Sequence, residues 1–149
     1  MEQSGDGDEL ALKLRHKYGL NSVRKRYVVF VDEETIAFSV GNLVQFLNVN
    51  GTSKQKFMIL QRRCEVGMIA VHPQKIFFVI GEGRNESAEF AEAVYVDVYE
   101  YPSLQLKKTL RGGAKSKYAF GEFSPDGSMF ATVSSAPDYL LTIWDWENE

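Results

Sequence analysis

The sequence predicts an all-β chain, and three observations support this fold class. Short runs rich in β-branched and aromatic residues, such as TIAFSVG (35–41) and AVYVDVYEY (93–101), follow one another and are separated by turn residues. No helical crossover lies between these runs, so neighbouring strands are expected to pair antiparallel through tight turns. The runs also recur three times in the same order, which predicts a partial WD40-type β-propeller of two blades and most of a third.

Composition and charge limit the class of protein. A chain of 149 residues with 44% apolar and 13% aromatic residues can build a sizeable core. The net charge of −3 gives no general attraction to nucleic acid or to anionic lipid, so neither is an expected partner. The single cysteine, Cys64, favours a reducing compartment such as the cytoplasm. The acidic N-terminus and the lack of an apolar run of roughly 20 residues predict neither a signal peptide nor a membrane span.

Residues 1–20 are predicted to form an acidic and then basic tail with a short helix. Asp8 is suited to cap such a helix and Gly19 to end it. Apolar side chains recur between them at helical spacing, at Leu10, Leu14 and Tyr18.

Residues 21–149 are predicted to form the incomplete propeller, with blades at about 24–60, 66–110 and 118–149. The third strand of each unit ends at equivalent pairs, namely Leu47-Asn48, Tyr99-Glu100 and Trp144-Asp145. The second members of these pairs are 52 and 45 residues apart, close to the roughly 40–45 residues of one blade. The surplus in the longer interval is the acidic stretch 82–92, which is expected to be an exposed hairpin tip.

The Trp-Asp pair has a physical role in this architecture. Trp144 is expected to fill the wedge between blades, while Asp145 follows it where the strand turns and can accept hydrogen bonds. Ser134 and Asp138 are expected to join Trp144 in a buried polar link. In addition, the third strand of the last blade is expected to leave an open edge through which the chain self-associates.

Two charged segments are candidate partner contacts. The hairpin contributes Glu86, Glu89 and Glu92, and the basic segment 11–26 contributes Arg24, Lys25 and Arg26. The basic segment has two interpretations: docking on an acidic surface such as a tubulin lattice, or a solvated face, which the pattern favours. A solvated loop is likewise favoured for the hairpin over a basic partner or a cation.

No catalytic, cofactor or metal site is predicted. The stretch 81–86 begins like a dinucleotide-binding loop but lacks its third glycine and opens no helix, so a solvent hairpin is expected. His16, His72 and Cys64 are not spaced as metal ligands, and His72 takes a turn position. No Ser or Cys stands in the context of an activated nucleophile.

Several stretches carry a resemblance to a known family. The segments GMIAVHPQK, YEYPSLQLKKTLRGG and PDYLLTIWDW, within a similarity from about Tyr18 onward, resemble the N-terminal WD-repeat region of the cilia- and flagella-associated protein 44 family. The resemblance implies a non-enzymatic scaffold of tandem propellers and coiled coil in the cytoplasm and the axonemal cytoskeleton. It also implies a tether complex that links an inner dynein arm to the doublet microtubule, with tether components, dynein and tubulin as partners.

This chain holds only two blades and three strands of a third, so it is expected to be a short form or a piece of a longer protein. Two alternatives stay open. One is a WD-repeat scaffold outside cilia. The other is an enzymatic propeller of lactonase or hydrolase type, which needs inward His, Asp or Glu residues, whereas the inner strands offer only basic residues at one edge and Glu122.

Overall fold

The computed structural model describes residues 28–51, 55–62, 64–84 and 93–148. Every regular element in this part of the chain is a strand, and none of its residues forms a helix. The strands are β1 (Val28–Phe30), β2 (Thr35–Val40), β3 (Leu43–Asn48), β4 (Lys56–Ile59), β5 (Glu65–Val71), β6 (Phe77–Gly83), β7 (Tyr95–Glu100), β8 (Leu106–Arg111), β9 (Tyr118–Phe123), β10 (Phe130–Ser134) and β11 (Leu141–Trp144).

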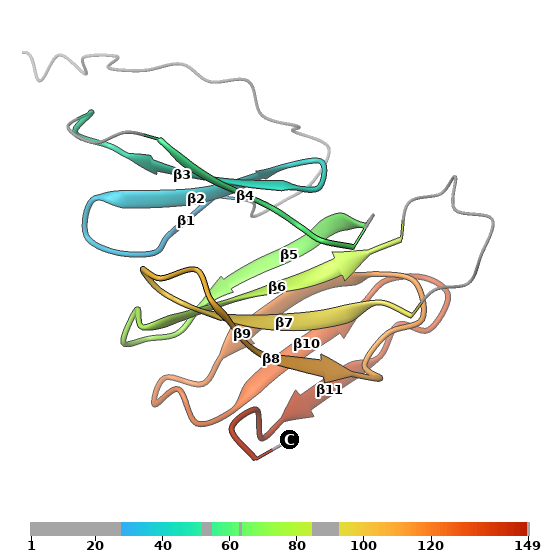
Figure 1. The fold of residues 1–149 in the computed structure, drawn as a ribbon. Helices are drawn as coiled ribbons and strands as arrows, with labels where there is room; N and C mark the ends of the chain where they lie inside the picture. Colours follow the sequence, from blue (N-terminus) through green and yellow to red (C-terminus); the bar gives the residue numbers. More distant parts are fainter. Residues whose placement is uncertain (1–27, 52–54, 63, 85–92, 149) are drawn as a thin grey trace, which may run out of the picture.

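The strands form three antiparallel sheets in which neighbours in sequence are neighbours in space (Figure 1). The first sheet contains β1 to β4, the second contains β5 to β8, and the third contains β9 to β11. Each is a meander joined by turns, as the alternating strand runs predicted. This arrangement confirms the all-β, partial propeller with two four-stranded blades and three strands of a third.

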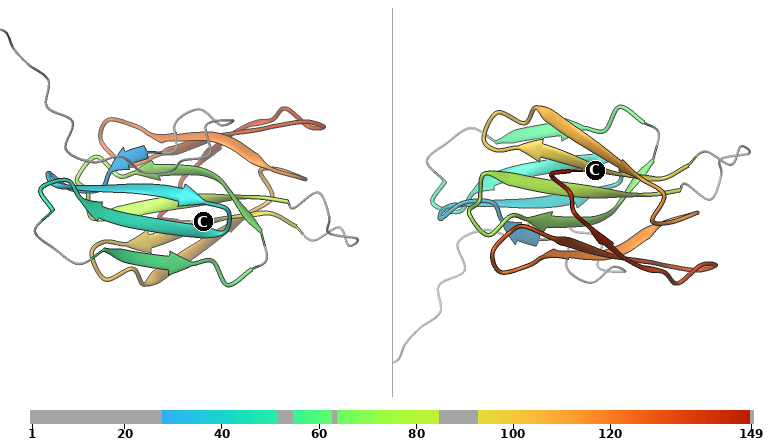
Figure 2. Two further views of the ribbon diagram at one scale, coloured as in Figure 1. Left: turned by 90° about the horizontal axis from the view of Figure 1, so that it is seen from above. Right: turned by 90° about the horizontal axis from the view of Figure 1, so that it is seen from below.

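The sheets stack in chain order, with the second sheet between the other two (Figures 1 and 2). Two cores hold them together. The first junction, between the first and second sheets, has the buried residues Val31, Ala37, Val44, Phe46, Leu60, Val66, Ile69, Phe78 and Ile80. The second junction, between the second and third sheets, has Met68, Ala70, Val79, Val94, Val96, Val98, Leu110, Tyr118, Phe123, Phe130, Trp144 and Trp146.

Strand alternation divides the side chains of the second sheet between the two junctions. Phe78 and Ile80 belong to the first junction, whereas Val79, between them in β6, belongs to the second. Because successive side chains of a strand point to opposite faces, a sheet covered on both sides needs apolar residues at consecutive positions. This explains the nearly continuous apolar run in β6.

The third sheet ends at β11, which has β10 on one side and no strand of the described residues on the other. The edge predicted from the sequence is therefore present. The predicted helix near Leu10 to Tyr18 lies outside the described residues. Within the described part of the chain, no helix is long and apolar enough to cross a bilayer.

Candidate functional site

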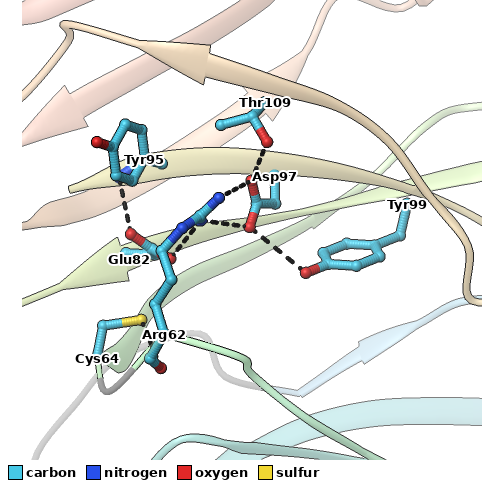
Figure 3. Close-up of polar contacts among 7 residues, drawn as sticks. All are labelled: Arg62, Cys64, Glu82, Tyr95, Asp97, Tyr99 and Thr109. Carbon is cyan, nitrogen blue, oxygen red and sulfur yellow. Dashed lines mark hydrogen bonds and ion pairs between the residues drawn. The ribbon is translucent and has the colours of Figure 1, made fainter. Parts of the chain in front are cut away.

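The most concentrated polar chemistry in the described residues lies at the first junction (Figure 3). Arg62 comes from the connector between β4 and β5, and reaches two carboxylates on the second sheet, Glu82 of β6 and Asp97 of β7. Its Nη1 lies 2.6 Å from Glu82 Oε1 and 2.7 Å from Asp97 Oδ2, and its Nη2 lies 3.3 Å from Asp97 Oδ1. We call these three residues the Arg62 clamp.

Other donors complete the coordination of the two carboxylates (Figure 3). The amide of Tyr95 donates to Glu82 Oε2 at 3.0 Å, and the Thr109 hydroxyl donates to Asp97 Oδ1 at 2.6 Å. The Tyr99 hydroxyl donates to Asp97 Oδ2 at 3.4 Å. Each of the four carboxylate oxygens therefore accepts at least one hydrogen bond within the protein.

The electrostatics of the site follow from burial. The carboxylate side chains are only 3% and 7% exposed, while the Arg62 side chain is 35% exposed. Burial alone would lower the pKa of Arg62, but hydrogen bonds to Glu82 and Asp97 raise it above its usual value. Burial, together with the charge of Asp97, raises the pKa of Tyr99. The guanidinium of Arg62 therefore stays charged near neutral pH.

Cys64 lies two residues after Arg62 and packs against the first core. Burial, reinforced by the Glu82 carboxylate, raises the pKa of its thiol to about 12. A thiol needs its deprotonated form to act as a nucleophile or a metal ligand. The environment of Cys64 is therefore that of an unreactive, structural cysteine.

The position of Glu82 shows that the solvent hairpin expected from the sequence begins later in the chain than Gly81. The stretch that begins at Gly81 was expected to be a solvent hairpin, and 82–92 an exposed acidic tip. Instead, residues up to Gly83 belong to β6, and Glu82 is only 2% exposed because it faces the first sheet and pairs with Arg62.

The repeat pairs occupy matching places in the three sheets. Leu47 lies opposite Ile36, Tyr99 opposite Phe78, and Trp144 opposite Phe130, in each case between the third and second strands. Turns with similar hydrogen bonds follow them: Gly51 N bonds Asn48 O, Leu104 N bonds Glu100 O and Asn148 N bonds Asp145 O. The second residue of each pair (Asn48, Glu100 and Asp145) therefore begins the turn that follows the third strand of its sheet.

The expected link among Trp144, Ser134 and Asp138 does not form. The Trp144 indole donates to Thr132 Oγ1 at 3.0 Å. Trp144 lies opposite Phe130, so Thr132, two residues along β10, is closer to it than Ser134, four residues along. Ser134 Oγ instead accepts the Leu140 amide at 2.8 Å, and Asp138 Oδ2 accepts the Lys115 amide at 2.7 Å. The polar residues therefore close separate turns.

Trp146 and His72 join the second junction, a role that sequence reasoning missed. The His72 ring lies edge-on to Phe123 and Trp146, with centroids 5.1 Å and 5.9 Å away. Trp146 donates to the carbonyl of Gly127 at 2.8 Å. Gly127 has φ of +80°, and a Cβ there would lie 2.1 Å from His72 Nε2, so only glycine fits. His72 remains a turn residue, since its Nδ1 accepts the Gln74 amide at 3.2 Å.

Three pockets lined by described residues are small for a ligand. Pockets between the described residues have volumes of about 190, 180 and 260 Å³, below the roughly 300–1,000 Å³ of typical small-molecule sites. Among the described residues, no three His, Cys, Asp or Glu side chains are grouped so that they could hold a metal ion. The candidate contacts Arg24, Lys25, Arg26, Glu86, Glu89 and Glu92 lie outside the described residues.

Comparison with known proteins identifies relatives of the chain. No protein-family model matches it. It is 31% identical to mouse cilia- and flagella-associated protein 44 over 138 residues, and 34% identical to the Chlamydomonas reinhardtii protein of that name over 134 residues. These alignments cover 93% and 89% of the chain but 7% of each relative, so the chain spans a small part of their length.

A solved structure supports the fold independently of the sequence. A chain in the crystal structure of the mitotic checkpoint complex matches 78% of this chain, with a TM-score of 0.60 and 16% identity. The match covers 35% of that solved chain. At this level of identity the likeness concerns the fold alone, a WD40-type propeller.

Proposed function

Because the chain belongs to the cilia- and flagella-associated protein 44 family over the region that they share, we propose that it is a non-catalytic scaffold segment of the axoneme in motile cilia or flagella. Its stacked sheets present rigid surfaces and loops to other proteins. The observation that carries this proposal is the family relationship over about nine-tenths of the chain.

The internal chemistry supports a non-catalytic role. A catalytic carboxylate needs an oxygen that can reach substrate, yet every oxygen of Glu82 and Asp97 accepts a hydrogen bond within the protein. The first strands of the three sheets, β1, β5 and β9, are the inner strands. Glu65 and Glu122 are the only residues in them with a carboxylate side chain. An enzymatic propeller would need more such groups around its channel.

The finer part of the proposal concerns the partners. We propose that the parent protein helps to tether inner dynein arms to the doublet microtubule, with dynein and tubulin among its partners. The acidic stretch that contains Glu86, Glu89 and Glu92 and the basic segment with Arg24, Lys25 and Arg26 are the proposed contacts. Charged segments on a rigid scaffold are suited to set partner specificity.

The test is the retention of the full-length protein in axonemes. Ciliated cells that express a tagged protein are stripped with detergent, and the axonemes are then extracted at rising ionic strength. We expect the protein in the axonemal pellet at low salt and its release at higher salt, because salt screens charge contacts. A protein found only in the soluble cytoplasm would contradict the proposal and favour a scaffold outside cilia.

A charge-matched pair of variants tests the acidic contact. Glu86, Glu89 and Glu92 are changed together to Gln in one variant, and the exposed Glu34, Glu122 and Glu147 in the control. We expect release at lower salt in the first variant only. Equal release from both variants would remove the acidic stretch from the contact and leave the axonemal assignment intact.

The open edge of β11 is a further proposed contact. Its outer backbone groups have no strand partner among the described residues, and such edges recruit strands from other chains. Self-association through this edge is part of the proposal, and sedimentation that shows a stable monomer at micromolar concentration would contradict it.

A further inference from the structure

Two small pockets adjoin at the outer side of the first junction. They lie where β4, the last strand of the first sheet, faces β8 and the turn that precedes it. Their volumes are about 190 and 260 Å³, and because an apolar cavity of roughly 150 Å³ can hold benzene, each has room for one apolar side chain. Leu104 lines both pockets, and we call the pair the rim groove. Its apolar walls are Phe46, Met58, Tyr99, Tyr101, Leu104 and Leu106.

Leu104 is held between the two pockets by a turn that strains its backbone. Its φ is +60°, in the left-handed region that bulky residues rarely adopt. The Leu104 amide donates to the carbonyl of Glu100 at 2.9 Å, which closes the turn between β7 and β8. Other turns of the chain place Gly51 and Gly127 in this region, where glycine has no strain. Strained residues cluster at ligand-binding sites, so a leucine at this position marks the rim groove as a candidate.

Each pocket also offers one polar group with unused hydrogen-bonding capacity. Arg62 lines the first pocket, and its Nε and one N–H of Nη2 have no hydrogen-bond partner among the described residues. The clamp already holds two carboxylates against one guanidinium, so a neutral acceptor such as a backbone carbonyl suits these donors better than a third carboxylate. Lys56 lines the second pocket and is exposed, with no ion pair to a described residue. Its ammonium is complementary to an acidic side chain.

We infer that the rim groove binds an extended segment of another protein, with an apolar side chain in each pocket, a backbone carbonyl on Arg62 and an acidic side chain beside Lys56. An extended segment suits this arrangement because its backbone carbonyls are free to accept hydrogen bonds while alternate side chains enter pockets. The groove lies between two four-stranded sheets and belongs to neither end of the stack. Such a site serves a scaffold equally well inside and outside cilia.

Selection from a random library of short linear peptides displayed on phage tests the groove, with the purified 149-residue chain as the target. We expect the enriched peptides to share two apolar positions and an acidic residue. A labelled synthetic copy of an enriched peptide should then bind the chain in fluorescence anisotropy. A library that yields no peptide specific for the chain would overturn the inference, and so would enriched peptides that lack the apolar positions.

Two leucine-to-glutamine variants locate the bound peptide. Leu106→Gln changes a wall of the groove at a residue that is 50% exposed, and Leu140→Gln is the control, since Leu140 is 46% exposed and precedes β11 in the third sheet. A glutamine amide covered by an apolar side chain is desolvated without a partner. We expect at least about tenfold weaker binding for Leu106→Gln and unchanged binding for the control. Denaturant unfolding of both variants shows that they are folded, and equal binding by the two folded variants would overturn the inference.

A second matched pair tests the acidic position of the bound segment. Lys56→Gln removes the cation of the groove, and Lys115→Gln removes an exposed lysine from the connection between β8 and β9. We expect only Lys56→Gln to weaken binding of the selected peptide. This difference should disappear when the acidic residue of the peptide is replaced by its amide, because the two changes remove the same contact. Equal effects of the two lysine variants would contradict the proposed occupant.

Discussion

The two junctions of this molecule both have apolar cores with packed aromatic rings, but they differ in the ion pairs around them. At the first junction, polar contacts surround the apolar core: the Arg62 clamp, an ion pair of 3.0 Å between Lys75 and Glu33, and a hydrogen bond from Tyr101 to Asp32. The second junction relies on aromatic rings and close backbone contacts, with His72, Phe123 and Trp146 edge to edge.

The comparison teaches that the junctions should respond differently to solution conditions. Burial opposes ionisation of Asp32, but hydrogen bonds from Tyr101 and from the Glu34 and Thr35 amides lower its pKa. Contacts of this type weaken when carboxylates become protonated. Acid should therefore loosen the first junction through its carboxylates.

The largest effect that we expect concerns Cys64, which reports on closure of the first junction. A pKa of about 12 instead of the ordinary 9.0 reduces the thiolate fraction near pH 8 by about a thousandfold. Alkylation by iodoacetamide in the folded protein should be at least about a hundredfold slower than in the urea-unfolded chain, as followed by mass spectrometry. Equal rates would show that the junction opens readily.

The next effect tests the aromatic junction. Trp144 is 3% exposed, so Trp144→Ala should lower the free energy of unfolding by about 3–5 kcal/mol, as a large core truncation. Denaturant unfolding measures this loss. Trp144→Phe is the control, since it retains most of the packing and loses only the hydrogen bond to Thr132. A loss below about 1 kcal/mol for the alanine variant would mean that the junction is frayed.

The third effect tests the charged junction. Arg62→Met leaves two buried carboxylates without their guanidinium, and we expect a loss of about 2–3 kcal/mol, below the usual range for buried pairs because Arg62 is partly exposed. Arg111→Met is the control, because Arg111 also lies over the Tyr95 ring, 5.4 Å from its centroid. Chemical denaturation of both variants at pH 7 gives the comparison.

The deficit of Arg62→Met should shrink as the pH falls. A carboxylate buried without a counter-charge has a raised pKa in the folded state, so its penalty is present above that pKa and disappears when the group binds a proton. A deficit that is constant down to pH 4 would show that lost packing, rather than charge, explains it.

The smallest effect concerns Asp145, whose carboxylate accepts hydrogen bonds from Asn148 alone among the described residues, at 2.9 and 3.0 Å. Because the residue is exposed and no buried donor depends on it, Asp145→Ala should change unfolding by less than about 1 kcal/mol. A loss above about 2 kcal/mol in denaturant unfolding would show a partner beyond the turn. The Trp-Asp pair thus divides into a buried anchor and a turn residue.

The fold was predictable because its signals are local. Apolar runs bounded by turns such as the one at Asp126-Gly127 gave strands in order, and a meander needs no further information to place neighbours. Repetition of the third-strand ending then indicated blades. These signals depend on residues a few positions apart, which a sequence displays directly.

The clamp was missed because it joins residues that lie far apart in the chain. Arg62 is 20 residues from Glu82 and 35 from Asp97, and no spacing rule connects a flexible connector to two strands. One signal was available. Alternation in AVYVDVYEY puts Asp97 on the same face as Tyr95 and Tyr99, so a carboxylate inside a strand covered on both sides required a buried cation.

The position of Arg62 also bears on how the molecule is made. Chains emerge from the ribosome with the N-terminal part first, so the guanidinium is available before β6 and β7 bring Glu82 and Asp97 together. The second sheet therefore never has to bury its paired negative charges alone during synthesis. A fragment that starts at β5 lacks Arg62. It should therefore accumulate poorly when it is expressed, even though all strands of the second sheet are present.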